Sequence, residues 1–198
     1  MQTKWIVAIV VGFLVLLGIG SYNGHVGRDE AVTSAWSEVL NQYKRRADLI
    51  PNLVKVVEGY ASHEKETLRA VVEARASATS MKVTPEVLND PAAFKKYEQA
   101  QGQLTQALSR LLVTVEKYPD LKANQGFRDL QVQLEGTENR ITVARNRYIT
   151  SVKDYNVGVR TFPGKLTAAF GDFPTKPNFA VENEKEISNA PNVEFGKQ

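Results

Sequence analysis

The sequence predicts an all-α protein: an elongated antiparallel bundle of three long helices that follows an N-terminal transmembrane helix. Three observations predict this fold. The chain begins with a long uncharged apolar segment, apolar residues then recur at steps of three and four, and no stretch alternates polar and apolar residues for long enough to form a strand. The number of bundle helices rises to four if the first one breaks at Pro51.

Composition narrows the possible functions before any motif is considered. The 198 residues, 42% hydrophobic and 24% charged, suit one globular domain and exclude a wholly disordered chain or a multi-span membrane protein. The chain has no Cys and two His, so we expect no disulfide, no metal site and no cofactor. The net charge of +3 is spread along the chain, which argues against nucleic-acid binding.

Residues 1–27 are predicted to form a membrane anchor and its flank. No charged residue lies between Lys4 and Arg28, and a helix of that length, about 34 Å, exceeds the roughly 30 Å of hydrocarbon in a bilayer. A cleaved signal peptide is the alternative, because Lys4 gives a basic start and Gly18-Ile19-Gly20 offers small residues near a cleavage point. The length of the apolar run, and Gly rather than Ala near its end, favour an uncleaved single-pass anchor.

The first bundle helix is predicted to begin at Arg28 or Asp29 and to end at residues 77–80. One apolar face follows from residues at steps of three and four: Val32, Trp36, Val39, Tyr43, Ala47, Ile50, Val54, Val57, Ala61, Leu68 and Val71. Pro51 lies within this helix, and proline lacks a backbone donor and crowds the carbonyl four residues back. We therefore expect either a kink at residues 48–52 or a new helix that begins at Pro51.

Two further helices complete the predicted bundle, which spans residues 28–173. Asp90 before Pro91 is a helix cap, and the helix that follows ends at Pro119, whereas Thr84-Pro85 starts at most one turn. The third helix runs from Phe127 to Pro163. Residues 170–173 are expected to cover the end of the bundle, and residues 174–198, polar and rich in Asn and Pro, are predicted to be a disordered tail.

Enzyme motifs are nearly absent, so we expect no catalytic residues and a protein that is not an enzyme. His63-Glu64 begins like a zinc-protease motif, but Thr67 stands where the second His is required. Four charged residues do lie on the apolar faces: Glu64, Arg75, Glu138 and Arg145. The favoured interpretation is a polar layer that fixes the register of the helices. The alternatives are a ligand or partner site, and an enzyme in which Glu64 and Glu138 act as paired carboxylates.

Several segments resemble the LemA family of bacterial membrane proteins, over about residues 5 to 173. The most specific is the run Arg45-Arg46-Ala47-Asp48-Leu49-Ile50-Pro51-Asn52-Leu53-Val54. The others are Tyr22-Asn23, Ala35-Trp36, Tyr60-Ala61, His63-Glu64, Ala74-Arg75, the run Tyr118 to Ala123, Thr137-Glu138, Ala144-Arg145, Tyr155-Asn156 and Phe162-Pro163. The sequence departs from the family pattern at Ile149, after Tyr148, and at Gly24-His25-Val26.

The resemblance implies a bacterial inner-membrane protein with a helical bundle and no established reaction. It places the short N-terminus outside and the bundle in the cytoplasm, whereas Lys4 favours the opposite orientation. We expect a membrane-anchored scaffold or adaptor that presents the bundle to protein partners, with a ligand-binding module as the alternative. The candidate partner or ligand surface comprises Trp36, Arg46, Asp48, Asn52, His63, Glu64, Arg75, Glu138, Arg145, Tyr155 and Asn156.

Helix lengths predict a layout in which the second helix is too short to reach the membrane end of the first. Residues 29–50 are then left without a partner in the chain, so their apolar stripe is expected to form a homo-oligomeric coiled coil or to bind a partner helix, with Trp36 central. The same layout places Glu64 level with Glu138 and Arg110. A rival arrangement bends the chain at Pro51 and folds residues 29–50 back onto the bundle.

The anchor generates the first testable prediction. If the apolar helix is an uncleaved anchor, the full chain should remain in the membrane fraction after carbonate washing. It should also keep Met1 or Gln2 at its N-terminus. N-terminal sequencing of the mature protein checks this prediction. A soluble product that begins at Ser21 would contradict it.

Overall fold

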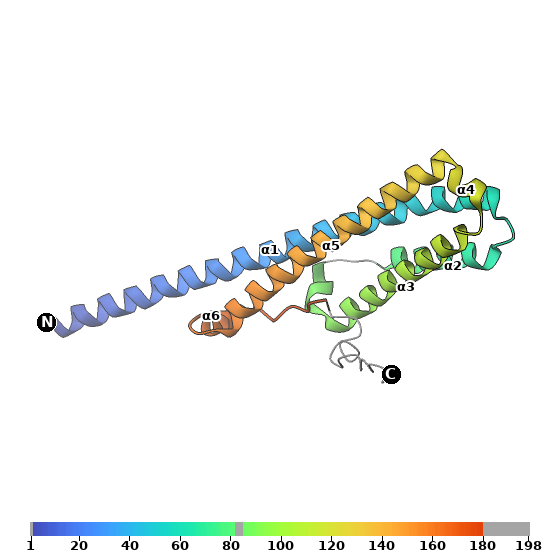
Figure 1. The fold of residues 1–198 in the computed structure, drawn as a ribbon. Coiled ribbons are helices and arrows are strands. Elements are labelled where there is room, and N and C mark those ends of the chain that lie inside the picture. The colour runs from blue at the N-terminus through green and yellow to red at the C-terminus, as the bar shows by residue number, and fades with distance from the viewer. Residues whose placement is uncertain (1, 82–84, 180–198) are drawn as a thin grey trace, which may run out of the picture.

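The computed structural model describes residues 2–81 and 85–179, and these residues form helices and connecting loops without any strand (Figure 1). The elements are α1 (Gln2–Tyr60), α2 (Lys65–Ser80), the 3-10 helix η1 (Pro85–Asn89), α3 (Pro91–Val115), α4 (Pro119–Ala123), α5 (Gln125–Arg160) and α6 (Gly164–Phe170). The predicted all-α bundle is confirmed. The way in which the chain is divided into helices differs from the prediction in two places.

The bundle is elongated, and its helices alternate in direction (Figure 1). α1 runs the length of the molecule, α2 turns back along it, α3 runs forward again beside α2, and α5 returns along α1. α4 lies in the turn at the end far from the N-terminus, and α6 lies at the near end beside α1. The long pair α1 and α5 is therefore the frame, and the shorter pair α2 and α3 covers part of one side.

The first difference concerns the start of the bundle, because no helix boundary occurs at residues 27–28. α1 is one helix of 59 residues, about 90 Å long, and it carries both the apolar segment and the first bundle helix. Large apolar side chains from Trp5 to Ile19 are at least half exposed, and this helix is long and apolar enough to cross a membrane. Packing against the rest of the chain begins at Ser21, seven residues before the predicted boundary, since the Ser21 hydroxyl lies 2.6 Å from that of Thr167 in α6.

The second difference concerns Pro51, which does not end the helix. α1 continues through Pro51 to Tyr60, and the chain turns at residues 61–64 instead. In this turn the Glu64 amide donates to the Ala61 carbonyl at 3.0 Å. The predicted helix over residues 29–79 is therefore two antiparallel helices. The sequence conceals the turn because positions 57, 61, 64 and 68 continue the helical spacing across it.

Arg75 replaces the helical hydrogen bond that Pro51 removes. Pro51 has no N–H to donate to the carbonyl of Ala47, four residues earlier, and Ala47 is buried. The Nε of Arg75 in α2 donates to this carbonyl at 2.7 Å. Pro51 thus leaves the Ala47 carbonyl of α1 free to accept from Arg75, and this hydrogen bond fixes the register of α2 on α1.

Two hydrophobic clusters fill the interior along the length of the bundle. The membrane-proximal cluster includes Trp36, Phe94, Tyr97, Tyr148 and Phe179. The distal cluster includes Ile50, Val57, Leu104, Leu111, Phe127 and Leu134. The α1 stripe over residues 32–43 thus packs inside the chain, where Val32 and Val39 have no exposed surface. The predicted unpartnered stalk, and with it the homo-oligomer through the stripe of residues 29–50, is wrong, because α5 runs back along α1 and covers it.

Residues 174–179, predicted to begin the disordered tail, form an extended segment that we call the strap. Phe179 is buried in the membrane-proximal cluster, and Lys176 is buried with its Nζ 2.8 Å from Asp29 on α1. Residues 180–198 of the predicted tail lie outside the described residues. Of the residues expected to cover the bundle end, Phe173 packs on Tyr22 with ring centroids 5.4 Å apart, whereas Phe170 is 92% exposed.

The contact between Pro51 and Arg75 generates a prediction about coupling. Arg75→Met leaves the Ala47 carbonyl buried without a donor and should lower the free energy of unfolding by about 1–3 kcal/mol. In a Pro51→Ala background the helix itself supplies that donor, so the same substitution should cost clearly less. Thermal unfolding of the four chains in detergent measures the coupling energy.

Arg69→Met is the matched control, because Arg69 lies on the same helix with its side chain 80% exposed and paired only with Glu73. It should change stability equally, and little, in both backgrounds. Equal losses for Arg75→Met with and without Pro51 would contradict the proposed compensation.

Candidate functional site

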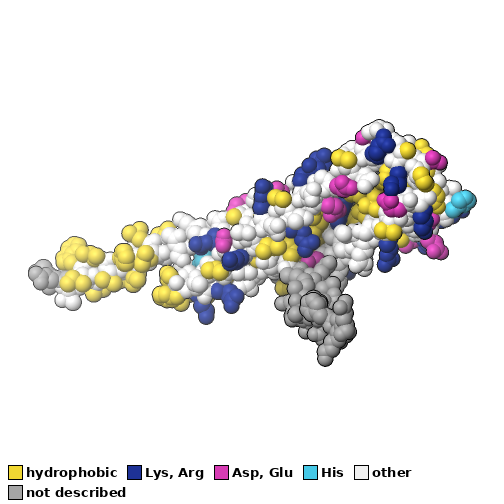
Figure 2. Space-filling view, viewed as in Figure 1, with side chains coloured by type: hydrophobic (Ala, Val, Ile, Leu, Met, Phe, Trp, Pro, Cys, Tyr) yellow, Lys and Arg dark blue, Asp and Glu magenta, His cyan; other side chains and the backbone are white. Residues whose placement is uncertain are grey.

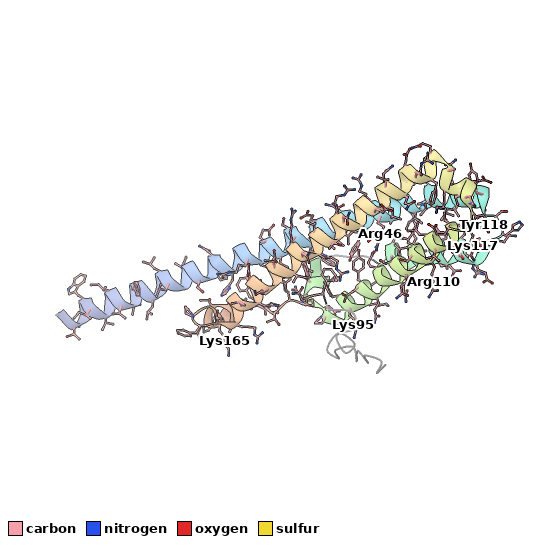
Figure 3. All side chains as sticks on the ribbon, in the orientation of Figure 1. Arg46, Lys95, Arg110, Lys117, Tyr118 and Lys165 are labelled. Carbon is pink, nitrogen blue, oxygen red and sulfur yellow. The ribbon has the colours of Figure 1, made fainter. Side chains whose placement is uncertain are left out.

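A polar layer separates the two hydrophobic clusters at the middle of the bundle. Arg46 lies between Tyr43 and Ile50 on α1, Gln101 between Tyr97 and Leu104 on α3, and Glu138 between Leu134 and Ile141 on α5. In each helix a polar residue interrupts the apolar face at the same level. We define the polar layer as Arg46, Gln101, Thr105 and Glu138; Figure 3 labels Arg46, whose side chain lies within the bundle.

Arg46 holds this layer together, and its guanidinium is almost fully buried at 1% exposure. Its Nη1 donates to Thr105 Oγ1 at 2.9 Å and to Glu138 Oε1 at 3.0 Å. Its Nη2 donates to Gln101 Oε1 at 2.6 Å and to the Gln101 carbonyl at 3.3 Å. A buried guanidinium requires a counter-charge and hydrogen-bond acceptors, and residues from α3 and α5 supply both.

Arg145 and Asp48 line two hollows at this layer. One hollow, of about 190 Å³, is lined by Arg46, Arg145 and Glu98, and the Arg145 Nη2 lies 3.5 Å from Glu98 Oε1. The Arg145 guanidinium also lies over the Phe179 ring, 4.2 Å from its centroid. The other hollow, of about 340 Å³, is lined by Asp48 and Arg75. Both Arg145 and Arg75 therefore make contacts with the chain itself.

The candidates at the distal turn do not join the polar layer. Glu64 accepts a hydrogen bond from the Tyr118 hydroxyl at 3.0 Å, and His63 and Asn52 are exposed. Glu138 lies 14 residues along α5 from its cap at Asn124, about 20 Å from the distal end where Glu64 lies. The predicted proximity of Glu64 to Glu138 is thus wrong, because the turn at residues 61–64 places Glu64 at the tip. The expected proximity of Glu64 to Arg110 stays a prediction. Among the described residues, no three His, Asp or Glu side chains gather in a way that could hold a metal ion.

Tyr155 and Asn156 hold the strap. The Tyr155 hydroxyl donates to the Pro174 carbonyl at 2.9 Å. Asn156 donates to the Lys176 carbonyl and accepts from the Lys176 amide, both at 2.9 Å, as a paired strand would. The Tyr148 hydroxyl donates to the Pro177 carbonyl at 2.9 Å. These residues fasten the strap and so bring Phe179 onto the core.

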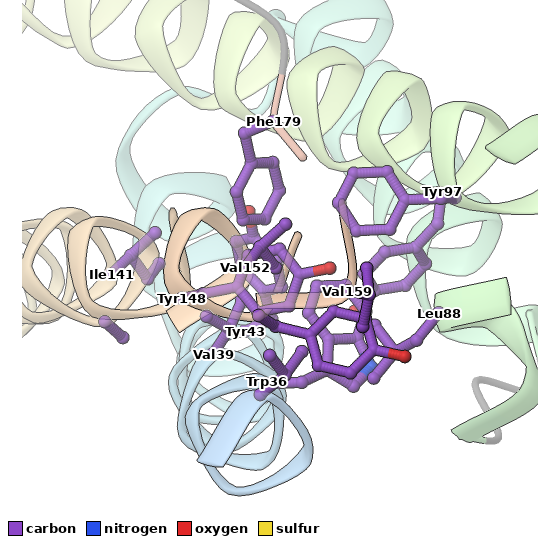
Figure 4. Close-up of a cluster of buried hydrophobic side chains, with 14 of the residues drawn as sticks. Trp36, Val39, Tyr43, Leu88, Tyr97, Ile141, Tyr148, Val152, Val159 and Phe179 are labelled. Carbon is purple, nitrogen blue, oxygen red and sulfur yellow. The ribbon is translucent and has the colours of Figure 1, made fainter. Parts of the chain in front are cut away.

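Trp36 lies at the centre of the aromatic cluster that the strap closes (Figure 4). Its ring centroid is 5.2 Å from that of Tyr148, 5.3 Å from Phe94 and 6.1 Å from Phe179. Trp36 is 2% exposed, so it cannot meet a partner without disruption of the core. Its expected role at the centre of an oligomer or partner surface is therefore wrong, and its contacts are those of a core residue.

Burial changes the titration of the tyrosines around the core. It raises the pKa of Tyr43, Tyr97 and Tyr148 above the ordinary value of 10, and it raises the pKa of Tyr155 to about 12. The hydrogen bond to Glu64 raises the pKa of Tyr118. The buried phenols remain neutral donors at physiological pH. Since their pKa values are higher in the folded chain, the stability they contribute is complete below pH 10 and is lost as the pH rises toward the raised values.

A shallow groove runs between α1 and α5 on the membrane-proximal part of the bundle. Two adjoining hollows, of about 660 and 740 Å³, share Ala31 and Ser151. The α1–α5 groove is lined mainly by small residues on α1 and by short polar or apolar residues on α5: Gly24, Gly27, Ala31, Ser34, Ala35, Val143, Asn146, Thr150, Ser151 and Val157. Its larger hollow is also lined by the charged residues Arg28, Lys153 and Asp154. Glu38 and Arg147 pair across the distal end of the groove at 2.7 Å.

Sequence reasoning missed the groove and parts of the polar layer. Arg46 was a candidate only through the family resemblance, yet steps of three and four from Tyr43 to Arg46 to Ile50 also place it on the buried face. Gln101 follows Tyr97 by four residues and precedes Leu104 by three, so the same spacing places it on the buried face of α3 and is the signal that could have identified it. The groove is formed by residues on two helices far apart in the sequence, so no local spacing indicates it.

Comparison with known proteins agrees with this architecture. The chain matches the LemA family over residues 35–195. It is 27% identical to magnetosome protein MamQ of Magnetospirillum gryphiswaldense and 26% identical to magnetosome protein MamQ 2 of Paramagnetospirillum magneticum, and each match covers 92% of this chain and 71% of the relative. It is 21% identical to protein LemA of Metamycoplasma hominis, with 78% of this chain and 66% of that protein covered.

The polar layer generates a prediction about stability. Glu138→Gln keeps the size of the side chain and an acceptor for Arg46 but removes the counter-charge of a buried guanidinium. We expect a loss of about 1–3 kcal/mol in the free energy of unfolding, measured in detergent. Glu135→Gln, on an exposed position one turn away, should change it by less than about 0.5 kcal/mol. Equal stability of the two variants would mean that the ion pair contributes nothing.

Proposed function

Because the chain belongs to the LemA family and begins with a helix able to cross a membrane, we propose that it is a single-pass inner-membrane scaffold that presents its bundle to protein partners. The observation that carries this proposal is the α1–α5 groove. It lies on the part of the bundle closest to the apolar segment, and both of its hollows open to the surface.

The shape of the groove suits a partner helix. The distance at which two helices pack depends on the side chains between them, and Gly27, Ala31 and Ser34 let another backbone approach closely. A methyl group at Gly27 would meet no atom within 4 Å, which means that the space above it is free. Val143 and Val157 are about half exposed and supply apolar surface to bury. An amphipathic helix that lays its apolar face in this groove is a known mode of recognition.

The two alternative functions have weaker support in the geometry. A ligand at the polar layer would occupy a hollow of about 190 Å³, below the roughly 300 Å³ of ordinary ligand pockets. The Nη groups of Arg46 are already satisfied by the chain. Paired carboxylates for catalysis would require Glu64 and Glu138 to meet, and the fold separates them. We therefore interpret the polar layer as a structural element that sets the register of the helices, without a catalytic role.

Photocrosslinking in cells that carry the chain tests the proposal. We expect p-benzoylphenylalanine at Ser34, which lines the groove, to form a discrete adduct with a partner protein. Ser37 is the matched control, because it is an exposed serine on α1 that does not line either hollow of the groove and donates to the Thr33 carbonyl of its own helix. The same photoprobe there should give no such adduct.

A substitution completes the test. Ser34→Arg places a long charged side chain in the groove and should abolish copurification of the partner from solubilised membranes, whereas Ser37→Arg should not. Adducts of equal yield at both positions, or copurification unaffected by Ser34→Arg, would contradict a partner site in the groove. An adduct of twice the chain mass would make the partner a second copy of the chain.

A further inference from the structure

We propose that α6 is a membrane-contact element: its exposed apolar face enters the boundary between lipid headgroups and acyl chains beside the transmembrane segment. This apolar face consists of Leu166 and Phe170, four residues apart on α6, together with Phe162 in the turn just before the helix. Phe162 is 80% exposed, Leu166 54% and Phe170 92%. Exposure of these two phenylalanines requires an explanation, because the bundle buries most of its aromatic side chains, including Trp36, Phe94 and Tyr148.

The position of α6 along α1 identifies what covers this face. A span of about 30 Å of hydrocarbon takes about 20 helical residues, so a span that begins at Trp5 reaches Gly24. α6 contacts α1 at the end of this span, since the Thr167 hydroxyl lies 2.6 Å from that of Ser21 and the Gly164 carbonyl accepts from His25 Nε2 at 2.9 Å. The helix is therefore held at the depth of the membrane interface.

The aromatic residues of α1 mark the same depth. Trp5 and Tyr22 are both largely exposed and lie 17 residues apart on one helix, about 26 Å, which matches aromatic residues at the two faces of a bilayer. Tyr22 packs edge-on against Phe173, three residues after the end of α6. Figure 2 shows hydrophobic side chains on the bare part of α1 and again at the end of the bundle beside it.

The local packing fixes the orientation of α6. Ala168 is buried and Thr167 is half-buried against α1, whereas Leu166 and Phe170, one turn apart, share the exposed side. A side chain at Gly164 would collide with the Gly158 carbonyl and with the His25 ring, so only glycine allows this approach. Lys165, labelled in Figure 3, is exposed on α6 next to Leu166, and the exposed Arg160 precedes Phe162 by two residues in sequence. Long basic side chains suit lipid headgroups.

Spin-label depth measurements on the full chain in phosphatidylcholine–phosphatidylglycerol vesicles test this proposal. The chain has no cysteine, so Ala169→Cys, an exposed position on α6, accepts a single nitroxide and leaves all three apolar residues intact. We expect the label to collide more often with oxygen than with a water-soluble nickel chelate, as it would near the acyl boundary. The control Val132→Cys, on α5 and 67% exposed in the distal part, should show the reverse.

Removal of the apolar face should then move the label into water. Phe170→Ser alone, and Phe162→Ser with Leu166→Ser and Phe170→Ser, should shift the label at position 169 toward the behaviour of the control, with unchanged helical content by circular dichroism. A label at position 169 as accessible to the nickel chelate as the control in the unsubstituted chain would overturn the proposal. So would spin–spin broadening that disappears on dilution with unlabelled chain, because a second copy would then cover the face.

Discussion

The packing of α5 along α1 is the interaction on which the rest of the structure depends. α1 leaves the apolar segment as one helix, and its buried face from Val32 to Val57 requires a cover of nearly the same length. α5 is the one described helix long enough to provide it, and its return path brings α6 and the strap to the membrane end. The strap then closes the aromatic cluster around Trp36, to which α3 contributes Phe94 and Tyr97.

Polar contacts set the register of this packing, which apolar faces alone specify weakly. Arg46 ties α1 to α3 and α5 at one level, and Arg75 ties α2 to α1 through the carbonyl that Pro51 leaves free. Each contact would leave a buried charge or acceptor unpaired if the helices slid past one another. The run from Arg45 to Val54, which resembles the family, thus contains both Arg46 of the polar layer and Pro51. Pro51 leaves the Ala47 carbonyl free to accept from Arg75 of α2.

Periodicity predicts the helical segments well because each one buries a single face, and the Asp90–Pro91 cap is a local device that holds in the structure. Periodicity fails to predict the structure where contacts between segments distant in sequence determine it. The turn at residues 61–64 keeps the helical spacing of its neighbours, so nothing in that spacing separates α1 from α2. The strap is polar by composition, yet Asn156 and Asp29 supply it with partners that lie far away in the sequence. Among the candidate residues, those of the polar layer come together, whereas His63, Glu64 and Asn52 lie apart from it at or toward the distal end.

The central claim is that the membrane segment and the bundle share one uninterrupted helix, so that the position of the bundle, of the groove and of α6 is set relative to the bilayer. Hydrogen–deuterium exchange of the full chain in lipid nanodiscs tests this claim most directly. The account predicts slow amide exchange from the membrane segment through residues 21–31 to about residue 57, with fast exchange first at residues 61–64. Fast exchange between Ser21 and Glu30 would reveal a hinge at the membrane surface and contradict the account.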